Sequence, residues 1–216
     1  MAGLQLGGHR RVPPNTRFQQ TRLGAPRLKN AMIEILPLTT LDPADLRRVA
    51  SGYSSDYKYL VTHTDSESHA AIDLQLIALQ EPYLKAYDHY DDETLQRYDQ
   101  ALGQEYSFGA YDGGLLAGLV LAEPHQWNRS VWVWEFHVAG AYRRRGLGKR
   151  LMECVVEKTQ RAGLRIIVCE TQSTNATAIQ IYRRLGFRIE GVDISYYSNQ
   201  DYPDGEVAVF MKRRLP

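Results

Sequence analysis

The alternation of apolar and polar residues is clearest in the second half of the chain. Residues 130–138 predict a strong strand, in which successive side chains point to opposite faces. One face of this strand is expected to carry Trp132, Trp134, Phe136 and Val138, and the other Val131, Val133, Glu135 and His137. Residues 166–170 are almost wholly apolar, which is typical of a buried parallel strand. Between these strands, residues 147–162 repeat apolar side chains three and four positions apart, which predicts an amphipathic helix.

A strand, a helix and a strand in this order predict a parallel pair joined by a right-handed crossover. The strands around this unit are expected to be antiparallel. Residues 106–111 and 115–122 flank Asp112-Gly113-Gly114, which predicts a hairpin turn. Two final strands are expected at 189–197 and 207–212, after a helix that Ser173 or Thr174 would cap. The elements together predict a mixed α/β sheet.

The first half of the chain is less regular. A short strand is expected at 33–36, and a helix opens at Pro43 behind the capping residue Asp42. A further helix is expected over 91–102. Residues 51–68 are polar and follow no clear period, and residues 71–80 fit either a strand or a helix.

Composition places the chain among ordinary globular proteins. It has 216 residues, of which 44% are apolar, and a net charge of +1, so no global charge attracts nucleic acid or a membrane surface. No apolar stretch is long enough to cross a bilayer. The histidines and the two cysteines do not have metal-ligand spacing, so we expect no metal site. Two free thiols favour a reducing compartment, and we expect a cytoplasmic protein.

The N-terminal segment differs from the rest in charge. It holds six basic residues and no acidic residue through Ala31. We expect residues 1–31 to be a disordered basic extension and residues 32–216 to form a single domain. A translation start at Met32 remains an alternative.

The most informative segment is Arg143-Arg144-Arg145-Gly146-Leu147-Gly148-Lys149, between the strand at 130–138 and the helix that follows it. A helix start leaves unpaired N–H groups and a partial positive charge. Two glycines let an anion approach that backbone closely, and the four basic side chains add charge. The segment therefore predicts a site for a pyrophosphate.

These residues also carry a resemblance. The segment from Glu135 to Phe187 resembles the GNAT acetyltransferase family, whose hallmark Q/R-x-x-G-x-G/A corresponds here to Arg143–Gly148. The family's asparagine at the start of the next helix corresponds to Asn175, and its Y-x-x-x-G-F motif to residues 182–187. The resemblance implies the GNAT fold, a mixed sheet of about seven strands flanked by helices, with parallel fourth and fifth strands splayed around the coenzyme.

The resemblance implies an acyltransferase that uses acetyl coenzyme A, without a metal, and direct attack of an amine on the thioester. Tyr182 is the expected proton donor to the leaving sulfur, with a core aromatic as the alternative. Glu170 is a candidate base or a structural carboxylate. Glu135 would bind or deprotonate the amine, or form a cross-strand ion pair, and His137 beside it is expected to be structural.

The same resemblance implies the coenzyme-binding residues. The backbone from Phe136 to Val138 would pair with the pantetheine arm as an added strand does, and the Asn175 amide would hold the same arm. The diphosphate would be bound by the remaining residues, which are Arg143, Arg144, Arg145, Gly146, Leu147, Gly148 and Lys149.

Within the family the chain is most similar to the streptothricin acetyltransferases, in Trp127-Asn128, Glu170-Thr171-Gln172 and Gly191-x-Asp193. This implies transfer to a primary amine of a small molecule, with a streptothricin-type antibiotic as the candidate acceptor and antibiotic resistance as the consequence. The alternative is a protein N-terminal α-amino or lysine acetyltransferase of the ribosomal-protein type. Acidic residues that could line an acceptor pocket, or equally lie in solvent, are Glu81, Asp88, Asp91, Asp92, Asp193, Asp201 and Asp204. A homodimer is left open.

Overall fold

The structure is a computed structural model that describes residues 33–87 and 90–216. The expected extension over residues 1–31 lies outside the described residues, as does Asp88. The main sheet has seven strands. In spatial order they are β1 (Glu34–Pro37), β4 (Phe108–Asp112), β5 (Leu115–His125), β6 (Ser130–Val138), β7 (Ile166–Gln172), β9 (Ala208–Arg214) and β8 (Arg188–Asp193). The expected mixed α/β fold is confirmed.

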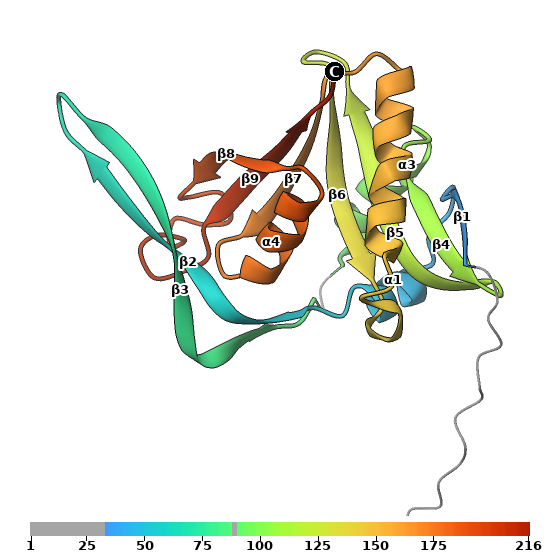
Figure 1. Ribbon diagram of the computed structural model, residues 1–216, viewed down its shortest axis with the longest axis horizontal. Helices are drawn as coiled ribbons and strands as arrows, with labels where there is room; N and C mark the ends of the chain where they lie inside the picture. Colours follow the sequence, from blue (N-terminus) through green and yellow to red (C-terminus); the bar gives the residue numbers. More distant parts are fainter. Residues whose placement is uncertain (1–32, 88–89) are drawn as a thin grey trace, which may run out of the picture. The chain divides into compact units, whose positions relative to one another are not determined.

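The parallel pair β6 and β7 lies at the centre of this sheet. The two strands are paired from Ser130 with Ile166 to Val133 with Cys169. In the described chain the ladder between them stops there, while β7 stays paired with β9 along its whole length. The two strands therefore diverge toward their carboxyl ends, which lie in the lower half of Figure 1. The expected splay of the fourth and fifth strands is confirmed.

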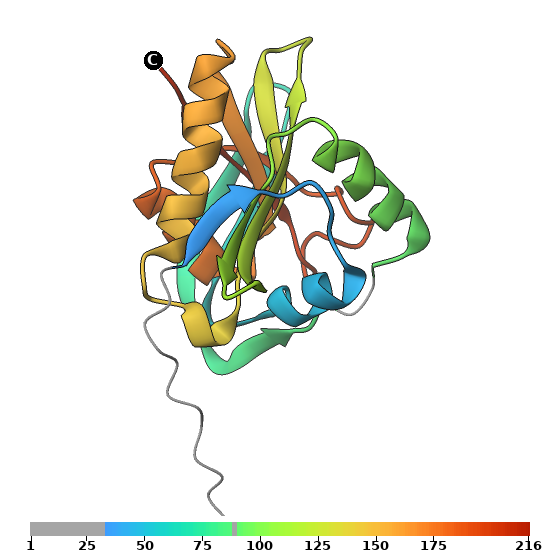
Figure 2. The ribbon, with the colours of Figure 1, turned by 90° about the vertical axis from the view of Figure 1, so that its right-hand side faces the viewer.

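Helices cover both faces of the sheet (Figure 2). The helix α3 (Leu147–Arg161) lies on one face, and α1 (Pro43–Val49) and α2 (Asp92–Leu102) lie on the other. The apolar stripe expected for α3 is confirmed, because the side chains that it buries are Leu147, Leu151, Met152, Val155, Val156 and Thr159. Leu151 and Met152 are fully buried against the sheet, and burying each such side chain contributes about 2 kcal/mol.

A β-bulge changes the faces of β6. Glu135 is paired with Leu121 and Val133 with Ala122, so Trp134 is an extra residue in the ladder. Phe136 and Val138 consequently face Gly148 of α3, whereas the ring of Trp134 lies 4.9 Å from Arg97 of α2. The prediction that all four aromatic and apolar residues share one face was therefore wrong. One inserted residue moves every following side chain to the opposite face.

The region without clear periodicity forms a separate two-stranded sheet of β2 (Tyr53–Asp65) and β3 (Ala70–Lys85), which projects to the left in Figure 1. The strand alternative for residues 71–80 is therefore confirmed. Most side chains of both strands are exposed or half-buried. A ribbon that buries so little of either face needs no strict alternation, and this is why the sequence pattern is weak.

The helix α4 (Ala176–Arg184) begins later than expected. Its capping residue is Asn175, whose Oδ1 accepts a hydrogen bond from the Ala178 N–H at 3.1 Å. The expectation that Ser173 or Thr174 would cap this helix was wrong. Both hydroxyls have other partners, because Ser173 accepts from the Val207 N–H and Thr174 hydrogen-bonds Glu206. The strand expected at 189–197 ends at Asp193.

Candidate active site

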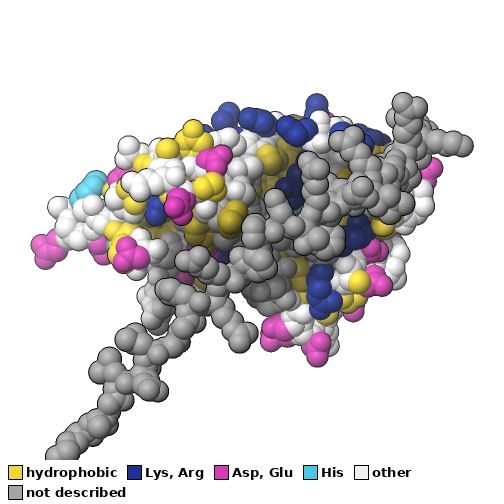
Figure 3. Space-filling view, turned by 90° about the horizontal axis from the view of Figure 1, so that it is seen from below, with side chains coloured by type: hydrophobic (Ala, Val, Ile, Leu, Met, Phe, Trp, Pro, Cys, Tyr) yellow, Lys and Arg dark blue, Asp and Glu magenta, His cyan; other side chains and the backbone are white. Residues whose placement is uncertain are grey.

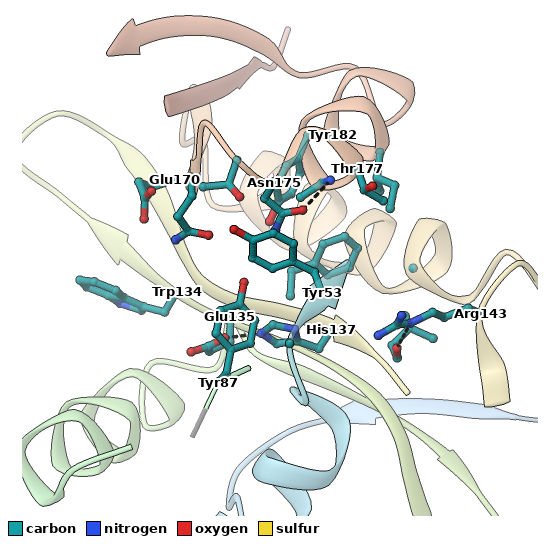
Figure 4. Close-up of a pocket in the computed structure, with 18 of the residues that line it drawn as sticks. Tyr53, Tyr87, Trp134, Glu135, His137, Arg143, Glu170, Asn175, Thr177 and Tyr182 are labelled. Atoms are coloured by element: carbon teal, nitrogen blue, oxygen red, sulfur yellow. Dashed lines mark hydrogen bonds and ion pairs between the residues drawn. The ribbon is translucent and has the colours of Figure 1, made fainter. Parts of the chain in front are cut away.

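A cleft of about 890 Å³ lies where β6 and β7 diverge. Its walls come from both strands, the start of α3, the start of α4, and tyrosines of the segments around Tyr53 and Tyr87 (Figure 4). The space opens because β6 and β7 are no longer paired here. In a continuous sheet the two strands would lie side by side and leave no gap. The cleft brings together residues from elements far apart in the sequence.

The start of α3 forms one end of the cleft. Gly146 is the N-cap residue with a left-handed φ of +76°, and no atom lies within 4 Å of the position a Cβ would take. The helix N–H groups are thus open to an anion, as the glycine pattern predicts. Seen from below, Lys and Arg side chains lie along the upper edge and over the right half of the molecule (Figure 3).

The residues of the basic loop differ in position. Residues 143, 144 and 146–149 line the cleft, but Arg145 does not. Its guanidinium lies 5.7 Å from the ring centroid of Tyr142. The Arg143 Nε donates to the Val138 carbonyl at 3.0 Å, which ties the loop to the end of β6. Leu147 is buried in the core, so only its backbone is available to a ligand.

The edge of β6 that faces β7 is unpaired over Phe136 to Val138, because the ladder ends at Val133. The Phe136 ring packs 5.9 Å from the ring of Tyr182 on α4. A strand edge without a partner strand, ending beside an open helix start, fits an extended ligand with a diphosphate at one end.

Asn175 lines the cleft and is 7% exposed. Its Oδ1 caps α4, and its side chain also hydrogen-bonds the Tyr87 hydroxyl. The amide predicted to hold a ligand therefore also holds the helix start. One lone pair of Oδ1 remains for a further donor.

Tyr182 lies between the two strands, and its ring packs 5.5 Å from that of Phe187. Burial raises the pKa of its hydroxyl well above the usual value, and the nearby Cys169 thiol acts in the same direction. The hydroxyl therefore stays protonated throughout the neutral range. That is the state a proton donor needs before the reaction.

Glu170 lies where β7 passes the cleft. Burial raises the pKa of its carboxyl to about 7, against the opposing effects of a Tyr197 hydrogen bond and the Lys85 charge. The Tyr197 hydroxyl donates to Glu170 Oε1. A carboxylate with this pKa both accepts and releases a proton near neutral pH.

Glu135 has two internal partners. The Tyr98 hydroxyl of α2 donates to its Oε1, and His137 Nε2 contacts its Oε2. A cross-strand ion pair of Glu135, the alternative considered from the sequence, is not seen among the described residues, and His137 is a neighbour on the same strand. Tyr87 packs edge-on against His137, with ring centroids 5.7 Å apart.

A third glutamate lies behind the cleft wall. Glu206 Oε1 accepts from the hydroxyls of Tyr53, Tyr83 and Thr174, and Oε2 contacts the Lys85 ammonium. Burial alone would raise the pKa of Glu206, but hydrogen bonds from Lys85 and Thr174 outweigh it and lower the pKa. This cluster joins the β2–β3 ribbon to the cleft.

Sequence reasoning missed most of the tyrosines of the cleft. Those that line it besides Tyr182 are Tyr53, Tyr87, Tyr90, Tyr98, Tyr142 and Tyr197. The chain has 14 tyrosines, and that abundance was the available signal. Of the acidic residues suggested for an acceptor pocket, none of the described ones lines the cleft, and Asp201 is only 4% exposed in a turn. The carboxylates in the cleft are Glu135 and Glu170.

Two further observations concern the described part of the chain. Its His, Cys, Asp and Glu side chains form no group of three or more that could hold a metal ion. None of its helices is long and apolar enough to span a membrane.

Comparison with known sequences finds a family match over residues 59–187, to the family described as Acetyltransferase (GNAT). A streptothricin acetyltransferase of Streptomyces lavendulae is 31% identical over 103 residues. That alignment covers 48% of this chain and 54% of the relative, so the chain spans about half the length of this curated relative.

Comparison with solved structures finds a nourseothricin acetyltransferase at a TM-score of 0.66 and 28% identity. The match covers 85% of this chain and 99% of that one. A candidate streptothricin acetyltransferase from Bacillus anthracis, in complex with acetyl coenzyme A, has a TM-score of 0.65 at 20% identity, with the same coverage. The latter likeness shows the fold alone.

Proposed function

The chain belongs to the acetyltransferase (GNAT) family, and we propose that it transfers an acetyl group from acetyl coenzyme A to a primary amine of a small molecule. A streptothricin-type antibiotic is the proposed acceptor. The observation that carries the proposal is the cleft between β6 and β7. It combines an anion site, a free strand edge, a buried tyrosine and a carboxylate that titrates near neutral pH.

The residues at the cleft fit the coenzyme in order along its length. The start of α3, with Gly146 and Gly148, would hold the diphosphate through backbone N–H groups, assisted by the basic side chains of residues 143, 144 and 149. The free edge of β6 and the Asn175 amide would hold the pantetheine arm. The bound coenzyme supplies a thioester carbonyl that an amine can attack.

We assign the two proton transfers of the reaction to two side chains, Glu170 and Tyr182. Glu170 takes one proton from the ammonium form of the acceptor, which frees the nitrogen lone pair for the new C–N bond. As the C–S bond breaks, the sulfur takes a proton from Tyr182, and the tyrosine recovers one from the acylated nitrogen. Glu170 releases its proton to solvent, so one proton is produced in each turnover. These roles remain proposals for Glu170 and Tyr182.

The residues on the acceptor side of the cleft favour a cationic small molecule as the acceptor. Glu135 and Glu170 supply negative charge, and tyrosine rings around them can stack on ammonium groups. Glu135, held by Tyr98 and His137, is proposed to bind a second charged group of the acceptor and not to act as the base. The names of the two relatives, streptothricin and nourseothricin acetyltransferase, support the same class of acceptor.

The coenzyme site is tested by calorimetry with coenzyme A on Gly146→Trp, with Gly114→Trp as the matched control. Both glycines have a left-handed φ and open space at the Cβ position, so the backbone strain of the two substitutions is comparable. Gly114 lies in the turn between β4 and β5, away from the cleft. We expect Gly146→Trp to abolish binding and Gly114→Trp to preserve it. Equal binding by both variants contradicts the proposed diphosphate site.

The acceptor is tested by measuring thiol release from acetyl coenzyme A with streptothricin, small primary amines, and peptides with free N-termini or lysines. We expect kcat/KM for streptothricin to exceed that for peptides by about 100-fold or more, which corresponds to roughly 3 kcal/mol. Higher turnover of peptides would favour a protein acetyltransferase. No thiol release with any amine would reject acetyl transfer, even if coenzyme A binds.

A further inference from the structure

Tyr197 contacts the proposed base from outside the segment Glu135–Phe187 that carries the family motifs. It lies on the segment between β8 and β9, and its hydroxyl donates to Glu170 Oε1 on β7. Among the described residues, no other side chain is seen to hydrogen-bond this carboxylate. Its orientation and its charge therefore depend on a residue that the acetyl-transfer scheme does not otherwise use.

Gln172 sets the direction of this hydrogen bond. Its Nε2 donates to the Tyr197 hydroxyl oxygen at 3.2 Å. A hydroxyl has one proton, so an oxygen that accepts from Gln172 directs its own proton elsewhere. That proton points to Glu170. The Gln172 Oε1 is buried without a hydrogen-bond partner in the described chain, although other atoms of the residue line the cleft.

The backbone around Tyr197 is held in place by Asp201, which is 4% exposed. Asp201 Oδ2 accepts from the Tyr197 N–H at 2.7 Å, and Oδ1 accepts from the Ser198 hydroxyl at 2.7 Å. The neighbouring Tyr196 ring packs edge-on against Phe210 of β9, with centroids 5.3 Å apart. A hydroxyl held this firmly loses little entropy when it bonds the carboxylate.

The surroundings of Glu170 oppose its charge. Burial disfavours the ionised form, as do the carboxylates Glu135 of β6 and Glu206 before β9, whereas the Lys85 ammonium of β3 and the Tyr197 hydrogen bond favour it. The other titratable groups near it are Cys169, Tyr87, Tyr182 and Tyr196. These groups are neutral at pH 7, so they do not offset the two carboxylates.

We propose that Tyr197 is a positioning residue for acetyl transfer, whose hydroxyl keeps the Glu170 carboxylate ionised and turned toward the acceptor amine. Gln172 directs the hydroxyl proton, and Asp201 holds the segment. This inference rests on the proposed function, because it assigns the proton-accepting role to Glu170.

The test compares Tyr197→Phe with Tyr196→Phe, which removes the hydroxyl of the adjacent tyrosine from the same segment. The pH dependence of kcat/KM with acetyl coenzyme A and streptothricin is measured for both and for the unchanged protein. A hydrogen bond to a carboxylate favours its ionised form, so its loss should move the acid limb of the Tyr197→Phe profile up by about one to two pH units. Activity at pH 7 should fall about tenfold or more and recover at higher pH, while Tyr196→Phe should follow the unchanged protein.

A second readout does not depend on turnover. The Glu170 carboxyl is titrated by carbon-13 NMR in the protein without ligands, with Glu170→Gln identifying the signal. We expect its midpoint to rise in Tyr197→Phe by the same amount as the activity profile, and to stay unchanged in Tyr196→Phe. If Tyr197→Phe does not fold, Gln172→Leu replaces it, and the shift should then be smaller and in the same direction.

The two proposals fail differently. Normal turnover by Glu170→Gln would reject Glu170 as the base and leave the NMR comparison to decide whether Tyr197 controls its charge. A Glu170 midpoint that is the same in Tyr197→Phe and in the unchanged protein would reject the positioning role, whatever the activity. A uniform loss of activity in Tyr197→Phe at every pH, with an unshifted profile, would also reject it.

Discussion

Three glutamates lie at or beside the cleft, and their partners give them different chemical roles. Glu206 is fully occupied by Lys85 and hydroxyl groups, and its pKa is lowered. Glu135 has a partner at each oxygen. Glu170 has one hydroxyl partner and a pKa of about 7. Since a base works best when its pKa is near the working pH, Glu170 is the most suitable of the three.

Replacing Glu170 by glutamine should change stability as well as activity. Because the pKa of Glu170 is raised in the folded protein, the stabilisation it contributes is complete below the unfolded value near 4.5 and is lost as the pH rises through about 7. Glutamine does not ionise. Denaturant unfolding should therefore show Glu170→Gln gaining about 1–3 kcal/mol relative to the unchanged protein between pH 4.5 and pH 8.

Glu190→Gln is the control for this measurement. Its carboxylate is hydrogen-bonded by Arg214, which lowers its pKa, so its stabilisation is present at neutral pH and lost on acidification. The relative stability of Glu190→Gln should be nearly constant between pH 5.5 and pH 8, and Glu190→Gln should gain relative to the unchanged protein only as the pH falls below about 4.5. A pH-independent difference for Glu170→Gln would mean that folding does not raise the pKa of this carboxyl.

Tyr182→Phe tests the proton donor. The ring packs against Phe136 and Phe187, and phenylalanine preserves both contacts. Coenzyme A affinity by calorimetry should stay within about twofold, whereas kcat should fall by about 10²- to 10⁴-fold, the usual contribution of a positioned acid. Normal kcat would show that the leaving sulfur obtains its proton elsewhere.

At the scale of single elements, the site depends on how helices and strands begin and end. The start of α3 is opened by Gly146, and the start of α4 is capped by a residue that also faces the cleft. The bulge at Trp134 places Trp134 and Glu135 on the same side of β6, where each contacts a residue of α2. Each of these local features places a side chain or a backbone group that regular structure would have placed elsewhere.

Asn175→Ala and Asp42→Ala form a matched pair at this scale. Each side chain caps a helix, α4 through the Ala178 N–H and α1 through the Ala44 N–H. Both variants should lose about 1 kcal/mol of unfolding free energy. Calorimetry should show weaker coenzyme A binding for Asn175→Ala alone, by about 5- to 50-fold. Equal affinity of the two variants for coenzyme A would show that Asn175 caps α4 and does not bind the coenzyme.

At the scale of the whole molecule, the cleft exists because β6 and β7 stop pairing with each other partway along the sheet. β7 stays bonded to β9 and β6 to β5, so the two halves of the sheet separate after Val133 and Cys169. Residues from β2, α2, β6, β7, the start of α3, α4 and the segment between β8 and β9 meet there. All seven strands lie between Glu34 and Arg214.

The first strand of the main sheet begins at Glu34. We therefore still expect residues 1–31 to lie outside the folded domain. A chain that begins at Met32 should keep the melting temperature within about 2 °C and the coenzyme A affinity within about twofold, measured by calorimetry at matched ionic strength. A tenfold loss of affinity that disappears at high salt would instead indicate that the basic segment contributes to anion binding.

The sequence by itself determined the local parts of this protein. Strand 130–138, helix α3 with its apolar stripe, the parallel crossover and the glycine-opened helix start all follow from neighbours a few positions apart, because periodicity and capping are local properties. The sequence did not determine the β2–β3 ribbon, whose faces bury too little to impose a pattern. The sequence also failed to predict which side chains of β6 share a face. The reason is the bulge, which depends on pairing with the neighbouring strand β5.

Only the tertiary structure brings together the residues on the acceptor side of the cleft. Tyr98, Glu135 and His137 meet across α2 and β6, and Tyr197 reaches Glu170 across 27 positions of sequence. The charge state of a carboxylate depends on burial and on partners brought to it by folding, so no local pattern distinguishes Glu170 from Glu206. Spacing along the chain specifies where a helix can bind a phosphate, whereas only the folded arrangement decides which carboxyl takes a proton.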